Sequence, residues 1–99
     1  MLFKDLPEPT LDLGDNHLLR FSRHGGDVVG ATEEHLRPDG KSCLGHFYFD
    51  LPETRDLLAG QDRPMWTVQS WNPLTLTPSL VCQDCGDHGF VREGKWVPA

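Results

Sequence analysis

Apolar and polar residues alternate over residues 45–51. Phe47, Phe49 and Leu51 would share one face of an extended chain there, and this period of two predicts a strand with one buried face. The next segment, 52–60, begins with proline and an acidic residue and ends with glycine. That polarity favours a short helix directly after the strand.

Shorter apolar runs bounded by Gly, Pro, Asn and Asp predict the remaining strands. The first sixteen residues contain two prolines and a Gly-Asp-Asn turn, which indicates an extended N-terminal arm over 1–16. The polar segment 31–42 gives no firm assignment. The expected strands are 17–23 with a hairpin partner at 27–30, then 65–71 and 74–77, and a last hairpin of 89–92 and 95–97.

A chain of 99 residues accommodates one domain, because autonomous domains cluster near ~100–150 residues. We therefore expect a single domain over residues 1–99, with a mostly β (α+β) fold of antiparallel strands and one short helix. A domain of this size buries only about 60–65% of the surface that its unfolded chain exposes. Its apolar core leaves a thin margin of stability, which a metal staple would widen.

The chain is acidic, with 15 Asp and Glu against 9 Lys and Arg and a net charge of −6. Because it has no Lys- or Arg-rich run, it lacks the electrostatic attraction that nucleic acids and anionic membranes require. No apolar run reaches the ~18 residues of a membrane span, and the N-terminus has no signal-peptide core. We expect a cytoplasmic protein, in the host cytoplasm if it is phage-encoded, with a protein partner and no nucleic-acid or membrane partner.

Three cysteines without an export signal indicate reduced thiols that are available to a metal. Cys82, Cys85 and His88 form a C-x2-C-x2-H run, whose turn brings both sulfurs to one side of the chain. Zn²⁺ is the expected ion for such sulfur and nitrogen ligands. The preferred site is Cys43, Cys82, Cys85 and His88. The alternative replaces His88 with His46, because Cys43-x2-His46 also has a metal-like spacing.

Other interpretations of these residues compete with a metal site. Buried free cysteines are common, so Cys43 and Cys82 could fill core positions. The C-x2-C run could be a redox pair, but the acidic residue between its thiols disfavours the thiolate. Ser79 lies outside a G-x-S-x-G elbow, which disfavours a serine hydrolase, and no catalytic residue is assigned. Three further histidines are expected at the surface or in turns: His17, His24 and His35.

The C-terminal third carries a Leu-Thr-Pro-Ser stretch within 74–80, then Cys85-x2-His88 and a hairpin. This order resembles a family of small, uncharacterised metal-binding proteins of bacteria and phages. Upstream, Cys43 and the strand end at 49–52 occupy the place of a cysteine-rich turn in that family, although only one of its two or more cysteines is present. The resemblance implies a small zinc-stabilised β-fold. Some members neighbour bacterial ubiquitin-like conjugation genes and others lie in phage genomes, and no activity follows from either.

These observations predict a small zinc-stabilised β-domain that acts as a protein-interaction or accessory module, with a phage-encoded protein as the leading context. The alternative is a small zinc-dependent hydrolase with an open metal position. The number of ligands separates the two, because four protein ligands leave no position for water. The sequence alone identifies neither the partner nor the oligomeric state.

Overall fold

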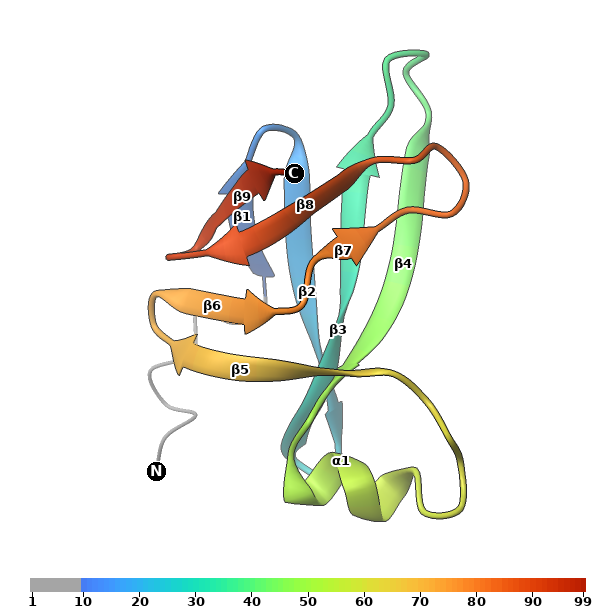
Figure 1. The fold of residues 1–99 in the computed structure, drawn as a ribbon, viewed down its shortest axis with the longest axis vertical. Coiled ribbons are helices and arrows are strands. Elements are labelled where there is room, and N and C mark those ends of the chain that lie inside the picture. The colour runs from blue at the N-terminus through green and yellow to red at the C-terminus, as the bar shows by residue number, and fades with distance from the viewer. Residues whose placement is uncertain (1–9) are drawn as a thin grey trace.

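Six strands of the chain form one sheet and three form a second in the computed structural model, which describes residues 10–99 (Figure 1). The larger sheet has the order β1-β2-β3-β4-β5-β6 and the smaller one has the order β7-β8-β9. All neighbouring strands are antiparallel except β4 and β5, which pair in parallel. The bounds are β1 Thr10–Gly14, β2 His17–His24, β3 Asp27–Leu36, β4 Ser42–Phe49, α1 Pro52–Leu57, β5 Met65–Trp71, β6 Leu74–Thr77, β7 Leu80–Val81, β8 His88–Arg92 and β9 Lys95–Pro98.

The apolar core lies where the smaller sheet packs across the long strands of the larger one (Figure 1). Trp96 of β9 stacks on His17 of β2, with ring centroids 3.9 Å apart and planes 9° from parallel. Phe47 and Phe49 meet edge to face at 5.6 Å. The buried cluster is Leu13, Leu19, Val28, Ala31, Phe47, Phe49, Leu74, Leu76, Val91 and Trp96.

The predicted fold class is confirmed, because the described chain is mostly β with one short helix. β5 and β6 have the predicted bounds, and β2 begins where predicted and is one residue longer. The strand expected at 45–51 is β4, which begins three residues earlier and ends two residues earlier. Of the expected N-terminal arm, residues 1–9 lie outside the described part of the chain. Thr10–Gly14 form β1, which pairs with β2.

β3 is the strand that the sequence left largely unassigned. It extends through the polar segment to Leu36 and pairs with β2 on one side and β4 on the other. Its inward residues in this part are Ala31, Glu33 and His35, which are all buried. Because two of the three are polar, the alternation of buried and exposed positions is not an alternation of apolar and polar residues.

The helix α1 is shorter than the predicted 52–60 and ends at Leu57. It begins with Pro52, which suits a first helical position because proline lacks the N–H that would have no partner there. Thr54 is fully buried and its Oγ1 donates a hydrogen bond to Val29 O at 3.2 Å. This bond holds α1 against β3. None of the helical residues between 10 and 99 forms a helix long and apolar enough to span a membrane.

Gly30→Ala tests the close approach of β3 and β4. A Cβ at Gly30 would clash with the backbone oxygen of Phe47, so the strands would have to separate. We expect the free energy of unfolding, measured in urea by tryptophan fluorescence, to fall by about 1–3 kcal/mol. The control is Gly45→Ala on β4, where no atom lies within 4 Å of the added Cβ. Equal losses in the two variants would contradict this close contact.

Candidate metal centre

A tight turn between β7 and β8 positions two of the three thiols. Cys82 N–H donates to Asp87 O at 2.8 Å, and Gly86 N–H donates to Cys82 O at 2.9 Å. Gly86 has a φ of +79°, a left-handed conformation that glycine adopts without steric cost. We refer to residues 82–87 as the knuckle. Its closed backbone places Cys82 and Cys85 on the side that faces β3 and β4.

Four side chains from three segments converge beside the knuckle. His35 and Cys43 are directly paired across β3 and β4, and both are 4% exposed. With Cys82 and Cys85 they offer one nitrogen and three sulfurs, all within 4.8 Å of one another. In a tetrahedral site with bonds of about 2.0–2.3 Å, ligand atoms lie roughly 3.5–4 Å apart, so the group can hold one metal ion. The donor set is consistent with zinc.

Glu33 orients the ring of His35. The carboxylate oxygens of Glu33 lie 2.9 and 3.0 Å from His35 Nδ1, and both residues are buried. His35 Nδ1–H donates to this carboxylate, which leaves Nε2 directed at Cys85 Sγ, 3.2 Å away. A histidine that ligates a metal commonly donates its other N–H to a carboxylate in this way. The arrangement therefore directs Nε2 toward the thiols before any ion arrives.

The electrostatics of the group favour a charged pair between His35 and Cys85. The hydrogen bond with His35 lowers the pKa of Cys85 to about 7. Burial works against the charged form of His35, but the hydrogen bonds to Cys85 and Glu33 outweigh it and raise its pKa to about 9. Burial raises the pKa of Cys43 to about 11. An ion bound here must therefore displace protons from His35 and Cys43, which makes its affinity dependent on pH.

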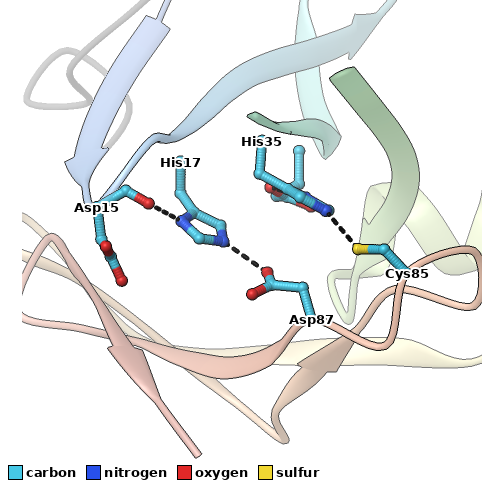
Figure 2. A network of polar contacts seen from close by, with 6 residues as sticks. Asp15, His17, His35, Cys85 and Asp87 are labelled. Carbon is cyan, nitrogen blue, oxygen red and sulfur yellow. Dashed lines mark hydrogen bonds and ion pairs between the residues drawn. The ribbon is translucent and has the colours of Figure 1, made fainter. Parts of the chain in front are cut away.

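A second histidine ties the knuckle to β2 (Figure 2). His17 Nδ1 lies 2.6 Å from Asp15 O, and His17 Nε2 lies 2.6 Å from Asp87 Oδ2. His17 Nε2 and Asp87 Oδ2 are also within ion-pair distance. The side chain of His17 is 6% exposed and that of Asp87 is 31% exposed, so the contact is partly buried.

The structure brings together three of the four residues in the preferred metal site. Cys43, Cys82 and Cys85 belong to the cluster, whereas His88 lies outside it and contacts Ser79 instead. His46, the alternative ligand, is exposed and contacts Thr32 and Tyr48. The fourth donor is His35.

The expectation that His17 and His35 lie at the surface is wrong. Both are buried beneath the knuckle. The signal in the sequence was the spacing Glu33-x-His35, which puts a carboxylate and an imidazole on the same face of a strand. The polar segment 31–42 is typical of a solvated loop, because no apolar alternation marks it as a strand.

Ser79 and His88 form a second pair of side chains that could take part in a reaction. Ser79 Oγ and His88 Nε2 are 2.8 Å apart, so the hydroxyl donates to the ring when the ring proton is on Nδ1. The register of β7 and β8 explains the contact: Val81 pairs with His88, and Ser79 lies two residues before Val81. Side chains two residues apart share a face, so Ser79 is the diagonal neighbour of His88. Sequence analysis had disfavoured Ser79 because it lacks a nucleophile elbow.

The fold and the cluster define a small β-domain with a Cys3His group that can hold a metal ion. The model of one protein family, described as bacterial ubiquitination-like system serine protease (BubE), matches residues 52–99, just under half of the chain. The matched part includes Ser79, His88 and the knuckle, and it leaves His35 and Cys43 outside. This is consistent with the resemblance to a bacterial family in the same C-terminal region. No curated protein and no solved structure matches the chain.

Replacing His35 tests which histidine is the fourth ligand. We expect His35→Ala to weaken metal binding by at least about 100-fold, because it removes a nitrogen ligand from a four-donor site. The measurement is metal per chain by mass spectrometry, with affinity from competition against a chromophoric chelator. His88→Ala is the matched control and should change the affinity less than about threefold. Loss of metal in His88→Ala with retention in His35→Ala would make His88 the ligand.

Glu33→Gln tests the orienting carboxylate. The amide can still accept a hydrogen bond from His35 Nδ1–H, but it lacks the negative charge that strengthens the imidazole as a ligand. We expect metal affinity to fall by about 10–100-fold in the same competition assay. Glu34→Gln, on the opposite face of β3, is the control. An unchanged affinity in Glu33→Gln would contradict a role for this carboxylate.

Proposed function

We propose that this chain is a serine-type protease that acts in a bacterial ubiquitination-like system, with Ser79 as nucleophile and His88 as general base. The observation that carries the proposal is the 2.8 Å contact between Ser79 Oγ and His88 Nε2. Both residues lie in the segment that matches a family model described as a serine protease. The substrate would accordingly be a protein.

The pair has the contact between hydroxyl and imidazole on which nucleophilic catalysis by serine begins. A serine hydroxyl becomes nucleophilic when an adjacent imidazole accepts its proton. Ser79 Oγ would attack a peptide carbonyl carbon while its proton moves to His88 Nε2. The same nitrogen would then return the proton to the departing amine and leave an ester on Ser79. Water would hydrolyse this ester with His88 as base, so one water is consumed and one acid and one amine are released.

The accessibility of the pair also supports the proposal. His88 is exposed and Ser79 is half-buried, so a protein substrate can reach both. Within residues 10–99 no carboxylate contacts His88, which makes the arrangement in this part of the chain a dyad.

We assign Zn²⁺ to the Cys3His group, with a structural role. Three thiolates and one imidazole are a typical donor set for structural zinc, and the four donors fill a tetrahedral shell. No coordination position then stays open for the water that a zinc-dependent hydrolase activates. The donor count therefore favours serine chemistry over the zinc-dependent hydrolase that the sequence suggested as an alternative.

A second candidate function is a non-catalytic interaction or accessory module, as expected from the sequence. Its support is the exposure of Leu36, Leu44 and Val81 at 51%, 66% and 54%. Contiguous apolar patches mark contacts with other proteins, and the register of β3 and β4 puts Leu36 and Leu44 on the same face of the sheet. In this case Ser79 and His88 would form an ordinary surface hydrogen bond, and neither would react.

Labelling with a fluorophosphonate probe separates the two candidates, because the probe reacts only with activated serines. We expect covalent labelling at Ser79, located by peptide mass spectrometry, and at least about 10³-fold slower labelling in His88→Gln. Ser79→Ala should abolish labelling. The controls are Ser22→Ala and His24→Gln on β2, which should label like the wild type. Absence of labelling in the folded, metal-loaded wild type would refute the protease and favour the accessory module.

A further inference from the structure

We propose that the protease binds its substrate as an extended polypeptide segment, which adds as a strand to the open edge of β4. The inference rests on the proposed function and narrows its substrate class to an unfolded stretch of protein, such as a tail or linker. Three observations carry it: an unpaired strand edge, a groove along that edge, and the position of Ser79 beside the groove.

The edge of β4 is open over most of its length. β3 pairs with β4 from Ser42 to Tyr48, but on the other side β5 pairs only with Tyr48 and Phe49. Asp50 N–H donates to Trp66 O at 2.7 Å, and backbone groups of alternate residues in such a strand point to the same side. The backbone groups of residues 44 and 46 therefore face the open side. They have no backbone partner there among residues 10–99.

A groove of about 320 Å³ follows this edge. Residues of β4 line one side of the groove and residues of β7 line the other. Within residues 10–99, β7 pairs with β8 and with no other strand. No atom lies within 4 Å of a Cβ built on Gly45, so the face of β4 is open at the middle of the groove. Its lining includes Leu44, Gly45 and His46 of β4 and Leu80 and Val81 of β7, and the cavity continues to the inner face of the sheet at Glu33, Phe47 and Trp96.

The groove adjoins the reactive pair. Leu80 lines the groove and directly follows Ser79 in the chain. Trp66 also lines the groove, and its Nε1–H donates to Ser79 O at 3.2 Å. Ser79 and His88 are not among the lining residues themselves, so a chain in the groove would pass beside the backbone of Ser79 and must extend past Leu80 to reach its hydroxyl.

An extended polypeptide fits these features better than a folded surface. Unpaired strand edges bind extended chains through backbone hydrogen bonds, and adjoining pockets select side chains. The exposed side chains of Leu44 and Val81 offer apolar contacts on the two walls. Asp84 also lines the groove, and the chain carries a net charge of −6, so acidic segments would be repelled.

His46→Pro tests the backbone contact. Proline removes the N–H that faces the open edge, and a strand tolerates it where that group bonds no neighbouring strand. The matched control is His46→Ala, which loses the same side chain and keeps the N–H. The probe is a pool of internally quenched decapeptides with randomised sequences, cleaved by the metal-loaded protein. We expect kcat/KM in His46→Pro to be about five- to tenfold below that in His46→Ala. Equal values would overturn the proposal.

A second measurement does not depend on how the variant folds. The best-cleaved peptide of the pool is resynthesised with one backbone amide methylated at a time and offered to the wild type. Strand addition predicts that cleavage falls at every second position near the scissile bond and is retained at the positions between, because only alternate groups face β4. Cleavage that is insensitive to methylation, or sensitive at consecutive positions only, would overturn the proposal.

The fluorophosphonate reaction separates a failure of this inference from a failure of the proposed function. The probe is small and needs no strand contact, so Ser79 in His46→Pro should label within about twofold of the rate in His46→Ala. Normal labelling with equal peptide cleavage in the two variants would support the proposed protease function and refute the proposed binding of substrate along β4. Absence of labelling in the wild type would refute the proposed protease function, and the proposed substrate binding with it.

Discussion

The convergence of His35 and Cys43 with the knuckle holds the smaller sheet against the larger one. These residues come from β3, β4 and the β7–β8 loop, so they are distant in the chain and meet only in the folded state. The apolar core of a domain with 99 residues gives a thin margin of stability, and three thiols crowded together add like charges if they ionise. A cation bound to this group would resolve both problems, because ligation to residues from separate segments contributes folding free energy directly.

The sequence predicted the strands whose inward faces are apolar. β4 was visible through Phe47 and Phe49, and the final hairpin was visible through its turn residues. β3 was not, because its inward face changes from apolar to polar where it passes beneath the knuckle, at Glu33 and His35. A pattern of hydrophobicity reports which side chains leave water only when the partner surface is also apolar. At this site the partner is a group of thiols and an aspartate.

The candidate site was predictable to the extent that its chemistry is local. Cys82 and Cys85 share one turn, and Cys43 was the one remaining thiol, so the sulfur ligands could be named from spacing and count. The histidine ligand could not be chosen among the five histidines in this way. The choice depends on the register of β3 against β4, which places His35 opposite Cys43. The contact of Ser79 with His88 likewise depends on the register of β7 against β8. Neither contact can be predicted from the spacing of these residues along the chain.

In the proposed mechanism the metal group and the Ser79–His88 pair are structurally linked. Ser79 lies before β7 and His88 begins β8, and the chain between these strands is the knuckle that contains Cys82 and Cys85. β7 has only two residues, too few to hold its register against β8 by backbone pairing alone. We therefore expect the turn that closes the knuckle to set the distance between the hydroxyl of Ser79 and the imidazole of His88. An ion bound to Cys82 and Cys85 would fix this turn further. A metal without an open coordination position can thus govern the reaction through geometry and take no part in its chemistry.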